Sequence, residues 1–131
     1  VKTEDIIHPV GEEVNPFRPM SDLPTVEELV EGLKYYIDSS KGHELKTYVG
    51  TLLPIEGWRT YAPFREEIRK EFNEWLRTSN DFAGCIDFDA AVRSEDIPER
   101  FREGFDSGDH LHPSKAAYQA MAKCAADFLK K

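Results

Sequence analysis

The sequence predicts a single α/β domain, residues 1–131, built on a parallel sheet. Helical and strand-like patterns alternate in the order helix, strand, helix, strand, helix, and elements in this order pack as parallel strands with helices on their faces. Both strand-like runs are short, as buried parallel strands are. A chain of 131 residues with 40% hydrophobic residues can bury one ordinary core but hardly two.

The first helix is predicted over residues 24–42. Thr25 and Glu28 form a capping box at its start, and Gly42 closes its end. Apolar residues recur at helical spacing between these signals, at Val26, Leu29, Val30, Leu33 and Ile37.

Two strands are predicted near residues 45–53 and 83–88. "LKTYVGTLLP" is too short for a domain helix and is stopped by Pro54, and "DFAGCIDFD" forms the second strand. We expect them to be parallel neighbours whose carboxyl ends carry the chemistry. Because two strands make a poor sheet, either "VKTEDII" adds a third short strand or the chain is part of a larger α/β domain.

Two further helices complete the order. Pro63 starts one over residues 63–79, with charged outer faces and an apolar stripe at Phe64, Ile68, Phe72, Trp75 and Leu76. Ser114 caps the last helix, whose apolar face is expected at Tyr118, Met121, Ala122, Ala125 and Phe128. Residues 8–22 and 93–109 are predicted to be surface loops.

Charge and hydropathy exclude several classes of partner. The net charge of −8 would repel nucleic acid and anionic lipid, so neither is an expected partner. No apolar run is long enough for a membrane span, and the polar start does not resemble a signal peptide, although the compartment stays open. Cys85 and Cys124 are expected to be buried free thiols.

The turn before the last helix holds the candidate catalytic residues. In "SGDHLHPS", Asp109 and His112 are three positions apart in a tight turn, so both side chains can face the same way. An aspartate that accepts a hydrogen bond from one imidazole nitrogen fixes the tautomer, and the other nitrogen can then take a proton from a nucleophile. We expect His112 to be the working base and His110 to point elsewhere.

Several stretches resemble the SGNH hydrolases, or GDSL-type esterases and lipases: "TLLPIEGW", "REEIRKEFNEWLRTS", "FAGCIDFDAAVR" and "FDSGDHLHPS". The resemblance implies a three-layer α/β/α, flavodoxin-like fold and hydrolysis of small acyl or acetyl ester substrates. It assigns Asp109 and His112 to the Asp and His of a Ser-His-Asp triad. No metal and no cofactor are expected.

Two departures from that family pattern matter. The sequence has no Gly-Asp-Ser block for the nucleophile, and Lys2 and Glu4 stand where the Gly-x-Asn-Asp block has Gly and Asn. Only Asp5 matches, and a carboxylate at Glu4 would repel a developing oxyanion. We expect the chain to be the C-terminal portion of an SGNH domain that self-associates or pairs with a missing N-terminal segment. The alternative is a non-catalytic module that kept the fold and lost the activity.

Other interpretations of the turn remain open. His112 could be a surface or capping residue beside an ordinary turn aspartate. His110 and His112 alternate along the chain, so with Asp109 they could bind a metal if the segment were extended.

Four more residues are candidates outside the turn. Trp58 and Tyr61 could line an acyl or sugar pocket, or could cover the sheet edge. Asp87 and Asp89 resemble a paired-carboxylate site, but residues at a strand end more often cap the next helix. His8 and His43 have no partners by sequence and are given no role.

Overall fold

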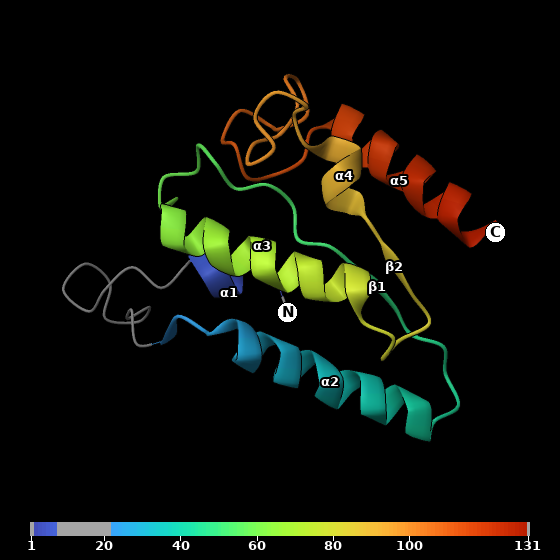
Figure 1. Ribbon diagram of the computed structural model, residues 1–131. Coiled ribbons are helices and arrows are strands. Elements are labelled where there is room, and N and C mark those ends of the chain that lie inside the picture. Colours follow the sequence, from blue (N-terminus) through green and yellow to red (C-terminus); the bar gives the residue numbers. More distant parts are fainter. Residues whose placement is uncertain (1, 8–21, 131) are drawn as a thin grey trace.

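A computed structural model describes residues 2–7 and 22–130 and shows an α/β fold (Figure 1). Its helices and strands follow the predicted order, with one additional short helix at each of two places. The elements are α1 (Glu4–Ile7), α2 (Val26–Gly42), β1 (Tyr48–Gly50), α3 (Pro63–Thr78), β2 (Gly84–Ile86), α4 (Phe88–Val92) and α5 (Lys115–Leu129).

The two strands are parallel neighbours, as predicted. Val49 of β1 lies opposite Cys85 of β2, and the described residues contain a sheet of these two strands. Both strands are shorter than predicted. After Thr51, whose N–H still donates to Ile86, the backbone N–H and C=O of Leu52 are both bound by the side chain of Asn73 from α3. A side chain therefore replaces a strand as the partner of this backbone.

The proposed third strand in "VKTEDII" is wrong, because this stretch forms the helix α1. The N–H groups of Ile6 and Ile7 donate to the carbonyl of Thr3, and both isoleucine side chains are buried. A helical turn carries two consecutive apolar residues into the core, whereas a strand would turn one of them outward.

The predicted ends of α2 and α3 are confirmed. The hydroxyl of Thr25 accepts a hydrogen bond from the N–H of Glu28, whose side chain in turn reaches the N–H of Thr25. The helix ends at Gly42 as expected, and Pro63 occupies the first turn of α3. These local signals need no tertiary partner, which is why the sequence alone locates them.

The predicted apolar stripe of α3 is only partly right. Phe72 and Leu76 are fully buried, but Phe64 is 46% exposed. The charged faces are also not all solvated, since Arg65 and Arg69 are buried. The buried side of α3 thus includes charged positions, because Arg65 donates to the carbonyl of Ile6 in α1 and Arg69 binds groups that follow the strands.

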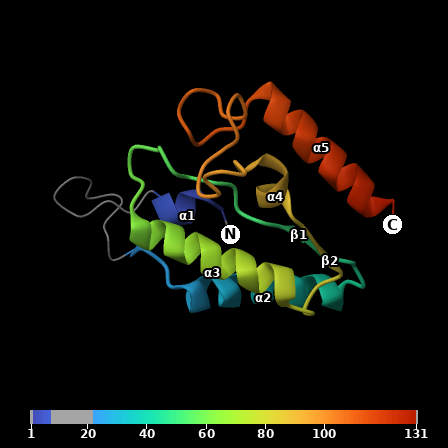
Figure 2. The same cartoon turned by 45° about the horizontal axis from the view of Figure 1, so that its top comes forward.

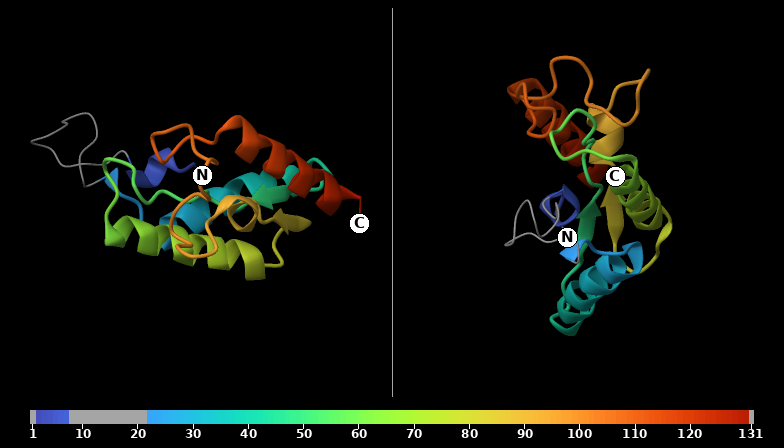
Figure 3. Two further views of the ribbon diagram at one scale, coloured as in Figure 1. Left: turned by 90° about the horizontal axis from the view of Figure 1, so that it is seen from above. Right: turned by 90° about the vertical axis from the view of Figure 1, so that its left-hand side faces the viewer.

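The two strands lie between the α2–α3 pair and α5, which gives three layers (Figure 2 and Figure 3). One hydrophobic cluster fills the side of α2 and α3, and it centres on Ile6, Leu29, Val49, Leu52, Phe72 and Leu76. A second, smaller cluster lies under α4 and α5, at Val92, Phe101 and Ala117.

The predicted apolar face of α5 is partly right, since Met121, Ala125 and Phe128 are partly buried. Ala117 is fully buried and Met121 packs on the second cluster, whereas Tyr118 is 56% exposed and Ala122 is also exposed. Ser114 caps the helix as predicted, by accepting from the N–H of Ala117. The sequence predicts an amphipathic helix here, but which of its residues face the core depends on the elements that pack against it.

The segment of residues 93–109 is not simply a surface loop. Phe101 within it is only 4% exposed, and it forms an antiparallel bridge with Arg93. Most of the other predicted loop, residues 8–21, lies outside the described residues.

Candidate functional site

The turn before α5 is held by backbone bonds and by two aspartates. Asp106 pairs with Pro113 in an antiparallel bridge, and its carboxylate accepts from the N–H groups of Gly108 and His110. Oδ1 of Asp109 accepts from the N–H groups of Leu111 and His112, at 2.9 Å each. The turn is therefore fixed around the carboxylates that it contains.

This turn brings Asp109 and His112 into direct contact. Nδ1 of His112 lies 2.5 Å from Oδ2 of Asp109. The hydrogen bond from His112, with the backbone N–H bonds, holds the pKa of Asp109 well below its usual range. An ionised carboxylate can only accept, so the neutral ring carries its proton on Nδ1 and leaves Nε2 unprotonated. The His112 side chain is 62% exposed and can meet a reactant.

His112 also lines a hollow of about 310 Å³ that brings together three separate parts of the chain. The lining comes from the start of the chain, from the segment after β1, and from the turn and the first part of α5, at Thr3, Glu4, Leu53, Leu111, His112, Pro113, Tyr118 and Met121. Since Leu53 follows β1, the turn lies on the carboxyl side of the strands, as predicted (Figure 1).

Of the two aromatic candidates, only Trp58 lies beside His112. Their ring centroids are 6.4 Å apart and the planes are nearly perpendicular, at 89°. The indole Nε1 of Trp58 is buried and has no hydrogen-bond partner among the described residues. Tyr61 lines a different hollow together with Glu56 and Glu66, and burial is the main cause that raises its pKa.

Glu4 shares the hollow with His112, and its side chain is exposed. Glu4, which stands where Asn was expected, is thus one of the residues that line the candidate site. Leu53, Leu111 and Met121 give the hollow its apolar walls, and no sequence signal marked them as site residues. Their role depends on chain segments that only the fold brings together.

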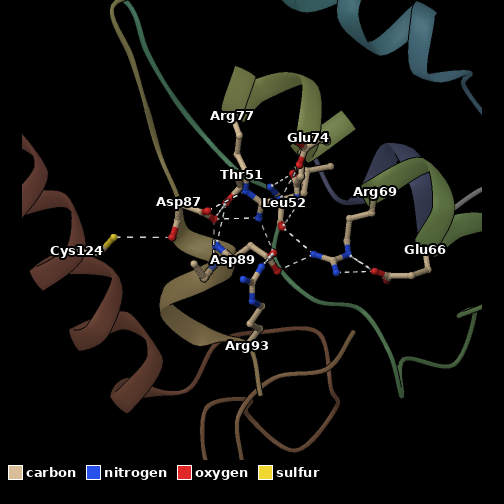
Figure 4. Close-up of polar contacts among 12 residues, drawn as sticks. Thr51, Leu52, Glu66, Arg69, Glu74, Arg77, Asp87, Asp89, Arg93 and Cys124 are labelled. Carbon is tan, nitrogen blue, oxygen red and sulfur yellow. Dashed lines mark hydrogen bonds and ion pairs between the residues drawn. The ribbon is translucent and has the colours of Figure 1, made fainter. Parts of the chain in front are cut away.

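The carboxylates of Asp87 and Asp89 belong to a cluster of ion pairs (Figure 4). Arg77 contacts Asp87 at 2.8 Å and Asp89 at 2.9 Å, and Arg69 contacts Asp89 at 2.8 Å. Arg93 adds a third arginine to Asp89, while Arg69 also holds Glu66. We call Glu66, Arg69, Arg77, Asp87, Asp89 and Arg93 the ionic cluster.

The carboxylates of the ionic cluster are held by burial and by ion pairs, as in groups that stabilise a fold. Burial raises the pKa of Glu66 despite its bonds to Arg69. Burial also opposes ionisation of Asp87, but hydrogen bonds from Arg77 and from the N–H of Ala90 outweigh it, so the pKa of Asp87 is lowered. Asp87 caps α4, as predicted for a carboxylate at a strand end, whereas Asp89 lies inside that helix. The cluster therefore ties α3 to α4 and to the residue that follows β2.

Metal binding gains no support from the described part of the chain. In residues 2–7 and 22–130, no three His, Cys, Asp or Glu side chains are grouped so that they could hold a metal ion. Cys85 and Cys124 are free and only partly buried, and burial raises the pKa of the Cys85 thiol. His43 is exposed after α2, and His8 lies outside the described residues. No described helix is long and apolar enough to cross a bilayer.

These features define an α/β protein with a carboxylate–histidine pair at the carboxyl side of a parallel sheet. The chain belongs to the family of GDSL-like lipases and acylhydrolases, whose model matches residues 3–125. The resemblance seen in the sequence is thereby confirmed. No curated protein matches the chain.

Among solved structures, the chain is similar to a protein from Desulfitobacterium hafniense DCB-2 described as lipolytic and of the G-D-S-L family. The TM-score is 0.64 and the sequence identity is 21%, so this likeness concerns the fold. The match covers 82% of this chain and 57% of the other. This chain thus corresponds to little more than half of that protein.

Proposed function

We propose that this chain supplies the Asp109–His112 dyad of an ester hydrolase. The observation that carries the proposal is the 2.5 Å contact between Nδ1 of His112 and Asp109, on a histidine that lines a hollow with apolar walls. This arrangement fixes the tautomer and leaves Nε2 as the base. Membership in the GDSL-like family supports ester bonds as the substrate class.

In the proposed reaction, Nε2 of His112 takes the proton of a serine hydroxyl while the serine oxygen attacks the ester carbonyl. The tetrahedral intermediate collapses when His112 gives that proton to the departing alcohol, and water repeats the sequence on the acyl-enzyme. Asp109 stays ionised throughout and stabilises the imidazolium. The nucleophile would come from a Gly-Asp-Ser block, which this sequence does not contain.

The proposal includes pairing with a segment that carries this serine, or with another copy of the chain. Tyr118, which lines the hollow, is 56% exposed, so an apolar surface is open beside His112. Light scattering on the 131-residue chain tests this part of the proposal. A monomer whose mass does not change when a serine-bearing segment is added would contradict it.

The catalytic part is tested with a longer form of the protein, expressed with whatever sequence precedes the codon for Val1 in its gene. We expect hydrolysis of p-nitrophenyl acetate, and His112→Ala to lower kcat by about a hundredfold or more. His43→Ala is the matched control, because His43 is also an exposed histidine but lies after α2. Unchanged turnover in His112→Ala would contradict the proposal. So would turnover by the 131-residue chain that His112→Ala abolishes, because the chain would then need no added serine.

One observation favours the second candidate, a non-catalytic module. Glu4 lines the hollow that contains His112, and a carboxylate there would repel a developing oxyanion. The longer form could contain a Gly-Asp-Ser block and still be inactive. If Glu4 is the cause, Glu4→Asn should restore hydrolysis. A longer form that stays inactive in Glu4→Asn supports the module.

A further inference from the structure

The two histidines of the turn have different neighbours on one loop. Residues 55–61 form a loop after β1. Within this loop, the ring centroid of Trp58 lies 6.4 Å from that of His112. The residue before it, Gly57, lies under the ring of His110. A Cβ placed on Gly57 would be only 2.7 Å from Cγ of His110 and 2.8 Å from its Cβ. The pair Gly57–Trp58 therefore faces the pair His110–His112.

The backbone turns His110 away from His112. His110 has a φ of 63°, in the left-handed region, and its N–H donates to Asp106 at 3.0 Å. Its ring nitrogen Nδ1 lies 3.8 Å from the same carboxylate. His112 is bound instead to Asp109. Two positions of one turn, separated by Leu111, thus carry imidazoles with separate carboxylate partners.

Gly57 is suited to this close approach in two ways. Its φ of 98° is one that residues with a side chain rarely adopt, and the space above it is occupied by His110. The same loop is also attached at Glu56, which binds Arg100 at 2.7 Å and donates its N–H to the carbonyl of Glu99, and at Thr60, whose hydroxyl donates to the carbonyl of Ile7. The contact with His110 is the attachment next to Trp58.

We propose that His110 is a positioning residue: its ring packs on Gly57 and holds the loop so that Trp58 stands against His112. Its importance for catalysis depends on the proposed function, but the contact itself does not. The indole Nε1 of Trp58 has no hydrogen-bond partner among the described residues, and the guanidinium of Arg59 lies 5.0 Å from the ring centroid, so contacts on the ring and the position of the loop orient the indole. A displaced Trp58 would leave one side of the His112 ring without its aromatic neighbour.

The test compares the NMR signals of the His112 ring protons and of the Trp58 indole N–H in variants of the 131-residue chain. Trp58→Ala defines the full loss of the ring-current shift at His112. His110→Asn removes the ring but keeps a residue that tolerates positive φ, and we expect it to cause most of that shift. His110→Gly also removes the ring, at a residue that accepts positive φ without strain, and should shift the signals as His110→Asn does.

A matched pair of glycine variants separates contact from backbone strain. Gly57→Ala brings a methyl group against His110, whereas Gly104→Ala has a similar φ of 82° and nothing within 4 Å. Gly57→Ala should displace the Trp58 and His112 signals, and Gly104→Ala should not.

The proposal is overturned if folded His110→Asn or folded His110→Gly leaves both signals unchanged. Because these measurements need no turnover, they can fail while the proposed function stands, and the reverse also holds. If Gly57→Ala does not fold, the two His110 variants still decide the question.

Discussion

The ionic cluster and the Asp109–His112 dyad use the same kind of contact in opposite surroundings. The carboxylate of Asp89 is 4% exposed and is bound by three arginines, at 2.8 to 2.9 Å. The carboxylate of Asp109 is 35% exposed, and its partner His112 is 62% exposed. The centre of the ionic cluster, Asp89 with Arg69, lies within the fold, whereas the dyad lies at the surface.

The difference teaches which charge pairs can do chemistry. Arginine does not release its proton in proteins, so the arginines of the ionic cluster keep their charge, and its carboxylates are held in ion pairs with them. Imidazole changes charge near neutral pH, and one of its nitrogens is free to do so in the dyad. We therefore expect substitutions in the cluster to change stability and substitutions in the dyad to change reactivity.

The largest effect is expected for Asp89→Ala. The change leaves Arg69 buried with one of its two carboxylate partners removed, and breaking a buried ion pair costs about 3–5 kcal/mol. The free energy of unfolding from urea titration should fall by that amount. Asp127→Ala is the control, because its pair with Lys123 on α5 is exposed and should contribute about 0–1 kcal/mol. Equal effects of the two substitutions would contradict the distinction.

A smaller loss is expected for Asn73→Ala. The N–H of Leu52 would lose its buried acceptor at 2.7 Å, which costs about 1–3 kcal/mol, while the carbonyl of Leu52 would keep its bond from Arg69. Urea titration measures the loss, and Asn80→Ala, at an exposed position, is the control. If Asn73→Ala is as stable as Asn80→Ala, the side chain does not replace a strand partner.

Asp87→Asn tests how the contribution of the ionic cluster to stability depends on pH. The amide keeps an oxygen that can cap α4 but loses the charge that pairs with Arg77. Because the folded-state pKa of Asp87 is lowered, its stabilisation is present above the unfolded pKa, about 3.9, and is lost as the pH falls through the folded pKa.

The measurement is the difference in unfolding free energy between the original chain and Asp87→Asn. We expect roughly 1 kcal/mol at pH 7, a modest value because both side chains are partly exposed, and a decreasing difference below about pH 4. A difference that grows as the pH falls would show that the sign is wrong.

Much of the fold could be predicted from local signals. The capping box at Thr25, the proline at the start of α3 and the serine cap of α5 act within a few residues, so the sequence locates these ends. The parallel pairing followed from the order of the elements. The ionic cluster could not be predicted, because the side of α3 that becomes buried is decided by Asp89 and Leu52, which are distant in sequence.

The candidate site was predictable to a similar extent. The contact between Asp109 and His112 spans three residues of one turn, and the pattern D-x-x-H contains it. The contacts of Trp58 with His112 and of His110 with Gly57 join two loops about fifty residues apart. No short pattern encodes them. Closeness in sequence does not predict a shared site either: Tyr61 lies three residues after Trp58 and lines a different hollow.

The smallest change in stability is expected at the dyad itself, together with a clear change at the imidazole. Asp109→Asn keeps an oxygen that can accept from the N–H groups of Leu111 and His112, and His112→Ala removes a mostly exposed ring. His112→Ala should change the unfolding free energy by about 0.5 kcal/mol or less, as surface substitutions usually do. In Asp109→Asn the amide can donate to Nδ1 of His112, so the ring proton should move to Nε2. Nitrogen-15 NMR of the neutral ring should show the unprotonated nitrogen at Nε2 in the original chain and at Nδ1 in Asp109→Asn. If the tautomer is the same in both chains, Asp109 does not set the proton position, and the dyad would be no more than an ordinary surface pair.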